Sequence, residues 1–120
     1  MEREIAVLQL RPHIETIKFD VETSVIESFQ NKTLRPILKW QNDVLISVYE
    51  SLTEPSQANM LPSEKRNRIK KILSNDSIIR NILIGIVLGM MTREELTFFF
   101  EHQKECRQRL VNMMVDRLAS

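Results

Sequence analysis

The hydrophobic and polar positions along the chain predict helices, and one predicted helix differs from the others. The stretch from Ile78 to Met91, IIRNILIGIVLGMM, is apolar on nearly every side of a helical wheel, broken only by Arg80, Asn81 and two glycines. A helix on the surface of a small globular protein normally carries a single apolar stripe. We therefore expect the helix over about residues 77–91 to be covered on several sides, by the rest of the fold or by a second copy.

Longer amphipathic patterns lie on either side of this helix. From Thr33 to Leu52 the apolar residues recur at spacings of three and four, with Thr33 as a candidate N-cap and Pro36 in the first turn. From Thr92 to Leu118 they recur about every 3.5 residues, after a capping-box sequence that begins at Thr92. The two patterns predict two long helices, each of which buries one face.

Shorter elements complete the predicted fold. Asp20 to Phe29 has the spacing of a short helix, and Ser63 is a candidate N-cap for a helix that runs to Leu73. Asn75 or Asp76 can then cap the apolar helix.

The predicted fold class is all-α, a four-to-five-helix bundle with one central, nearly all-apolar helix. Residues 1–20 are expected to form a poorly defined N-terminal arm, and residues 21–120 a single helical bundle domain. The chain of 120 residues has only two glycines and four prolines, which favours long helices over a sheet with many turns.

Composition and charge exclude several classes of protein. The net charge of +1 gives no general attraction to nucleic acid or to an anionic membrane. The single cysteine excludes an intrachain disulfide. The start of the chain lacks the basic residues and the long apolar run of a signal peptide. The apolar run Ile82–Met91 is about half as long as a membrane span. We expect a soluble, cytoplasmic protein that does not enter the membrane.

Gly85 and Gly89 share one face of the apolar helix with Ile78 and Ile82. Two glycines at this spacing let another backbone approach closely, either from a second copy or from a neighbouring helix of the same chain. The helix has two further apolar faces, and a small bundle rarely has enough material to bury all three. The pattern therefore favours a dimer interface formed by these four residues.

The candidates for metal chemistry are weak. His102 and Cys106 are four residues apart, with Glu105 beside them, which is a possible spacing for metal ligands on a helix. A structural zinc site needs four protein ligands, and the other histidine, His13, is far away in the sequence. Cys106 also lies on the apolar stripe, where a thiol usually packs as a small hydrophobic group. We expect no cofactor.

Two polar segments are candidates for ligand binding. The basic run Lys65–Lys71 could contact phosphates, but it has no interleaved aromatic residue, so a solvated helix face is favoured over a nucleic-acid site. Arg35, Gln41 and Asn42 are candidates for a small-molecule site. Gln41 lies on the buried stripe and needs a hydrogen-bond partner, for example Gln103, which favours a polar bridge in the core over a ligand site.

Two strings in the sequence carry a resemblance. FQNKTLRPILKWQN (residues 29–42) and NMMVDRL (residues 112–118) resemble segments of small helical bacterial proteins of unknown function, and the resemblance extends from about Glu27 to the C-terminus. Some of those proteins carry the label "glyoxalase". Glyoxalase I enzymes are built from βαβββ modules with metal ligands on strands, and this sequence predicts no such strands. The resemblance therefore implies a helical fold and no catalytic residues.

The favoured function is that of a homodimeric interaction or scaffold module without catalysis. One alternative is a small helical enzyme or metal-binding protein that uses His102, Cys106 and Glu105, or a pocket lined by Arg35 and Gln41. Another is a weak nucleic-acid binder through Lys65–Lys71.

Overall fold

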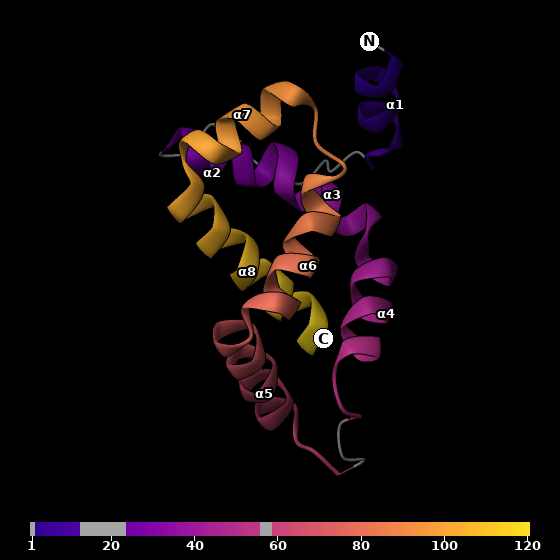
Figure 1. Ribbon diagram of the computed structural model, residues 1–120, viewed down its shortest axis with the longest axis vertical. Helices are drawn as coiled ribbons and strands as arrows, with labels where there is room; N and C mark the ends of the chain where they lie inside the picture. The colour runs from indigo at the N-terminus through magenta and orange to yellow at the C-terminus, as the bar shows by residue number, and fades with distance from the viewer. Residues whose placement is uncertain (1, 13–23, 56–58) are drawn as a thin grey trace.

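The computed structural model describes residues 2–12, 24–55 and 59–120 (Figure 1). Every regular element in these ranges is helical, which confirms the all-α fold class. The elements are α1 (Glu2–Leu10), α2 (Val25–Phe29), the π-helical turn η2 (Gln30–Leu34), α3 (Arg35–Trp40), α4 (Asn42–Leu52), α5 (Pro62–Asn75), α6 (Ser77–Leu88), α7 (Arg93–Glu101) and α8 (Gln103–Ala119). None of the described helices is both long enough and apolar enough to cross a membrane.

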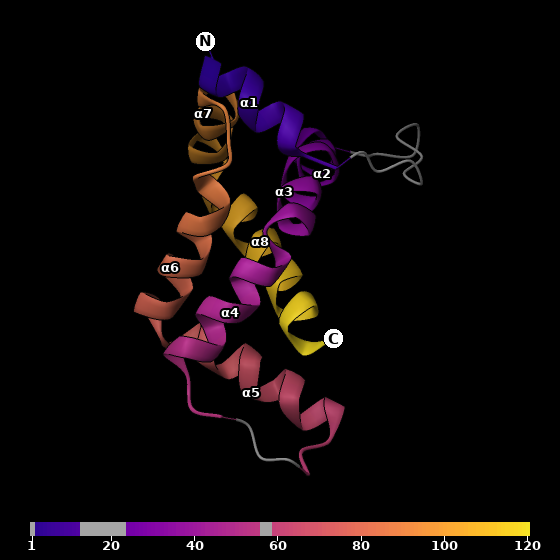
Figure 2. The ribbon, with the colours of Figure 1, turned by 90° about the vertical axis from the view of Figure 1, so that its right-hand side faces the viewer.

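The predicted apolar helix forms as α6, which packs against α4, α5 and α8. Asp76 caps its start, since the carboxylate accepts a hydrogen bond from the Ile79 N–H at 3.0 Å. Figures 1 and 2 both show α6 beside α4, with α5 at the end of the molecule opposite α1. Ile79, Leu83 and Val87 are buried in the core, whereas another side of α6 is exposed.

The hydrophobic core lies between α3, α4, α5, α6 and α8. Each of these helices contributes fully buried apolar side chains to the core: Ile37, Leu38, Leu45, Ile69, Leu73, Leu83, Ile84, Leu110 and Met114. α8 packs against α5 and also contacts α4, α6 and η2, so one face of the C-terminal helix covers several segments at once.

The prediction of one continuous helix from Thr33 to Leu52 is wrong. The segment consists of η2, α3 and α4, with Gln41 between α3 and α4 at φ −92° and ψ 8°. Pro36 explains the widened turn before it, because proline has no N–H and its ring clashes with the carbonyl four residues earlier. Thr33 is therefore not an N-cap; it is buried inside η2, where its hydroxyl donates to Glu95 Oε2 at 3.0 Å.

The helix predicted from Thr92 to Leu118 also divides in two. The capping box at Thr92 is confirmed, but the helix breaks at His102, which has φ −118° and ψ 36°. The His102 ring lies 4.4 Å from the Phe98 ring, which in turn stacks on Phe29 at 4.5 Å. The break lets α7 reach α2 through the Phe98–Phe29 ring pair while α8 turns towards α5 (Figure 1).

Two other boundaries differ from the prediction. α5 begins at Pro62, which suits the first position of a helix, so Ser63 lies inside the first turn and is not the N-cap. Residues 2–10, expected to belong to a poorly defined arm, form α1. Residue 1 and residues 13–20 of that arm, like the first residues of the helix predicted from Asp20, lie outside the described residues; α2 itself is capped by Ser24.

Candidate functional site

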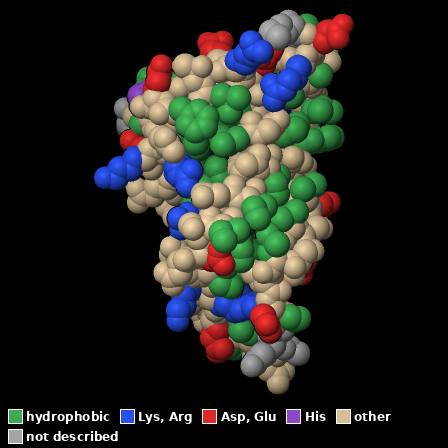
Figure 3. Space-filling view, viewed as in Figure 1, with side chains coloured by type: hydrophobic (Ala, Val, Ile, Leu, Met, Phe, Trp, Pro, Cys, Tyr) green, Lys and Arg blue, Asp and Glu red, His purple; other side chains and the backbone are tan. Residues whose placement is uncertain are grey.

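The apolar side chains that remain exposed on α4 and α6 make one continuous candidate surface. On α6 the side chains of Ile78 and Ile82 are 72% and 40% exposed, and on α4 those of Val44 and Leu52 are also exposed. The two helices pack together, and Leu52 and Ile78 line the same surface hollow. Figure 3 shows hydrophobic side chains gathered over these helices. We call the surface formed by Val44, Leu52, Ile78, Ile82, Gly85 and Gly89 the α4–α6 face.

The charged and amide groups of α6 are directed away from this face. Arg80, the only charged residue of α6, donates to the backbone carbonyls of Leu73 and Ser74 at 3.0 Å each. Asn81 accepts a hydrogen bond from Arg107 at 2.8 Å. These contacts leave the α6 part of the α4–α6 face without a charge from Ile78 to Gly85, while the Arg3 guanidinium lies at the Gly89 carbonyl.

The two glycines of α6 make no room for another helix of the same chain. Among the described residues, a Cβ atom added at Gly85 would meet no atom within 4 Å, and one added at Gly89 would meet only carbonyl oxygens of its own helix, the nearer at 3.4 Å. The alternative of a close crossing within the chain is therefore wrong. Each glycine inside a helix costs about 1 kcal/mol relative to alanine, and packing within a single chain does not offset that cost at Gly85.

The three candidate metal ligands His102, Cys106 and Glu105 pack or pair with other residues of the chain. Cys106 is fully buried, and burial raises the pKa of its thiol. Glu105 pairs with Arg109 at 3.2 Å, and the His102 ring packs on Phe98. In the described ranges no group of three or more potential ligands could hold a metal ion, and His13 lies outside them.

Part of the basic run on α5 is engaged within the chain. Arg66 forms an ion pair with Asp116 on α8, and Arg68 donates to the backbone carbonyl of Glu54 at 2.5 Å. Both contacts attach α5 to its neighbours.

The three candidates for a small-molecule site contact different parts of the chain. Gln41 donates to the backbone carbonyl of Ile86 at 3.4 Å, so its partner is α6 and not Gln103. Asn42 instead accepts a hydrogen bond from Arg117 on α8 at 3.3 Å. Burial, and to a smaller extent the charge of Arg35, lowers the pKa of Arg117. The structure therefore joins Asn42 to Arg117, whereas Arg35 donates to Asn31. The sequence did contain a sign of Arg117, because this arginine occupies a position on the apolar stripe of the last predicted helix.

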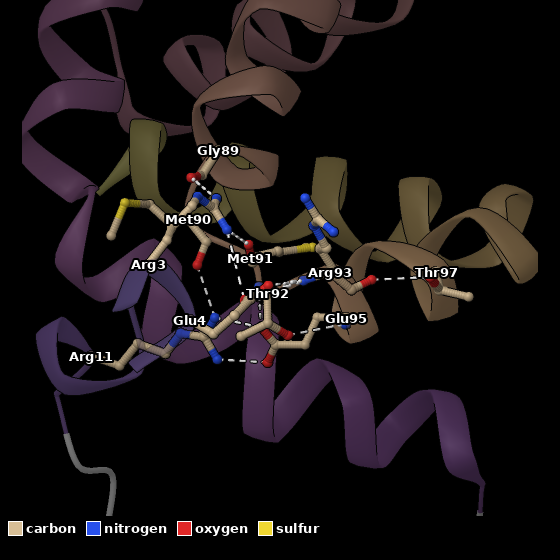
Figure 4. Close-up of polar contacts among 10 residues, drawn as sticks. All are labelled: Arg3, Glu4, Arg11, Gly89, Met90, Met91, Thr92, Arg93, Glu95 and Thr97. Carbon is tan, nitrogen blue, oxygen red and sulfur yellow. Dashed lines mark hydrogen bonds and ion pairs between the residues drawn. The ribbon is translucent and has the colours of Figure 1, made fainter. Parts of the chain in front are cut away.

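A polar cluster at the junction of α6 and α7 was not predicted (Figure 4). The Arg11 side chain, only 7% exposed, donates to both oxygens of Glu95, at 2.6 and 2.5 Å, and to the Met90 carbonyl at 2.8 Å. Arg3 donates to the carbonyls of Met91 and Gly89, both at 2.9 Å. The two arginines hold α1 across the end of α6 and satisfy carbonyls that the helix leaves without partners.

Glu95 is the centre of this cluster. Burial by itself raises the pKa of the Glu95 carboxyl, but hydrogen bonds from Arg11, the Thr92 N–H and Thr33, together with the charge of Arg11, outweigh burial and lower it. The carboxylate therefore stays ionised and joins α1, η2 and α7.

No protein-family model matches the sequence, and neither a curated protein nor a solved structure shows significant similarity to it. The resemblance to small helical bacterial proteins stays a prediction. Function is therefore inferred from the geometry of the chain itself.

Proposed function

We propose that the protein is a homodimeric interaction module that associates through the α4–α6 face. The observation that carries the proposal is the exposure of Ile78 and Ile82 beside Gly85, where a Cβ would meet no atom of the described residues within 4 Å. Contiguous exposed apolar surface on a soluble domain commonly marks a protein interface.

A second copy of the chain is the partner that this surface suits best. In a two-fold dimer the same residues meet across the axis, so a charged surface would repel its own copy. From Ile78 to Gly85 the α6 part of the face carries no charge, because Arg80 is directed to α5. Two α6 helices that cross at Gly85 would approach closely, and the isoleucines of each would pack on the other copy.

Ile82→Glu is the first test of this interface. In the dimer the new carboxylate would be buried against its own copy, so the dissociation constant should rise by at least about tenfold. Sedimentation velocity over a range of concentrations measures it. Val25→Glu is the matched control, because Val25 is 65% exposed on α2, away from this face, and its change should leave the dissociation constant as it is. Equal dissociation constants for the wild type and Ile82→Glu would contradict the proposal.

Gly85→Leu distinguishes the interface from the fold. The single chain has open space at Gly85, so the leucine should leave the unfolding midpoint of dilute protein unchanged or higher. The same side chain would separate two helices that cross at this point, so association should weaken. A Gly85→Leu protein that associates as tightly as the wild type would exclude a close crossing.

A further inference from the structure

A partly enclosed hollow lies between α4, α5 and the end of α8. Its volume is about 290 Å³, which is at the small end for a ligand pocket. Its apolar wall is formed by Ile46 of α4, Ile69 of α5 and Leu118 of α8, of which Ile69 and Leu118 are buried. None of the six residues of the α4–α6 face lines it, so this hollow does not depend on the proposed dimer.

Four charged side chains, two of each sign, line the same hollow: Glu50, Glu54, Lys65 and Arg68. In the described part of the chain none of the four forms an ion pair. Arg68 donates to the backbone carbonyl of Glu54 and not to its carboxylate. Opposite charges that share a hollow without pairing suit a ligand that carries both signs, whereas a simple anion or cation would lie beside two like charges.

Tyr49 adds a hydrogen-bond donor to the wall of the hollow. It is 6% exposed, and its hydroxyl is shielded and makes no hydrogen bond of ordinary geometry with any described residue. Burial raises the pKa of the phenol, against the smaller opposing effects of Arg68 and Thr53, so the hydroxyl is protonated at neutral pH and donates. A buried polar group without a partner is destabilising, so an acceptor that reaches this hydroxyl gains a hydrogen bond.

We propose that this hollow binds a small zwitterion with an apolar side chain, of the chemical class of the aliphatic α-amino acids. The ligand carboxylate accepts hydrogen bonds from Lys65, Arg68 and the Tyr49 hydroxyl, which becomes accessible as the long basic side chains turn to the ligand. The ligand ammonium group pairs with the two exposed glutamates, and its aliphatic side chain packs on the apolar wall.

A series of ligands tests the site on the wild-type protein. Tyr49 is the only tyrosine of the chain, so in protein with ¹³C-labelled tyrosine a single set of ring signals reports on the hollow. L-leucine should shift these signals and saturate at one molecule per chain. Glycine lacks the apolar group, 4-methylpentanoate lacks the ammonium group and 3-methylbutylamine lacks the carboxylate, so each should bind at least about threefold more weakly. The proposal is overturned if L-leucine at up to about 10 mM leaves the signals unchanged, or if any of the three analogues binds as tightly as L-leucine.

Three variants then assign the contacts, with the backbone amide of Ile69 in ¹⁵N-labelled protein as the reporter. Tyr49→Phe removes only the hydroxyl and should weaken L-leucine binding by about tenfold, and Lys65→Gln should weaken it by at least about threefold. Lys70→Gln is the matched control, because Lys70 is exposed on the same helix and does not line the hollow. Unchanged binding in Tyr49→Phe, or an equal loss in Lys65→Gln and Lys70→Gln, would also contradict the proposal.

Discussion

Glu95 accepts hydrogen bonds from two side chains and one backbone N–H, which come from three different parts of the sequence. It completes the capping box at Thr92 and also accepts hydrogen bonds from Arg11 and Thr33. The capping box could be predicted, because its residues are three apart in the sequence. Arg11 is 84 residues away from Glu95, and no local pattern indicates such a partner.

Glu95→Gln should destabilise the fold by about 2–3 kcal/mol. The amide can still accept from the Thr92 N–H, but a guanidinium that is 7% exposed loses its counter-charge. Urea unfolding measures the change. Glu94→Gln, an exposed neighbour in the same turn, should change the free energy of unfolding by less than about 0.5 kcal/mol, and equal losses in both variants would contradict this role.

The contribution of Glu95 should also depend on pH. Its pKa is lower in the folded protein than in the unfolded chain, so its stabilising effect is complete above the unfolded pKa and is lost as the pH falls through the folded pKa. The difference in unfolding free energy between the wild type and Glu95→Gln should therefore shrink as the pH is lowered from about 7 to about 3. A difference that stays constant over this range would show that the ion pair does not act in this way.

Tyr49 illustrates an unsatisfied polar group. Its hydroxyl is shielded and makes no hydrogen bond of ordinary geometry with any described residue, while the nearby Thr53 hydroxyl donates to the Tyr49 carbonyl at 2.8 Å. Burial raises the pKa of this phenol, against the smaller opposing effects of Arg68 and Thr53. Tyr49→Phe should therefore keep or raise stability, by up to about 1 kcal/mol, in urea unfolding. A loss of more than about 1 kcal/mol would reveal a hydrogen bond of the hydroxyl that matters for the fold.

At the scale of elements, the sequence predicted which segments are helical better than where they end. α6 and the capping box at Thr92 follow from periodicity and from local caps, and both are confirmed. The breaks at Gln41 and His102 could not be predicted, because neither residue is a glycine or a proline and the break at His102 accompanies ring contacts with Phe98 and Phe29. Tertiary packing overrides helix propensity at such points.

Gly85→Ala tests whether the Gly85 side of α6 is free of packing within the single chain. Alanine has room at this position in the single chain, so dilute protein should gain about 1 kcal/mol of stability. Gly89 caps the C-terminal end of the helix, so Gly89→Ala should gain less. Thermal or urea unfolding at low concentration measures both variants, and a loss of stability in Gly85→Ala would mean that this side of α6 is covered within the chain.

At the scale of the whole molecule, the other helices cover only part of α6. The amphipathic helices cover part of α6 and leave Ile78 and Ile82 exposed, which the apolar pattern of residues 77–91 already indicated. The contact between Arg117 and Asn42 arises only when α8 packs against α4, so the sequence marked Asn42 as a candidate but did not single out Arg117. Exposed apolar faces are visible in local patterns, whereas a site built from distant residues needs the fold.

The molar mass of the wild-type protein in solution tests the central proposal most directly. Sedimentation equilibrium over a range of protein concentrations should give twice the 14.1 kDa of one chain at the upper end, with a reversible fall towards 14.1 kDa on dilution. A molar mass of 14.1 kDa at every concentration would contradict a dimer formed through the α4–α6 face.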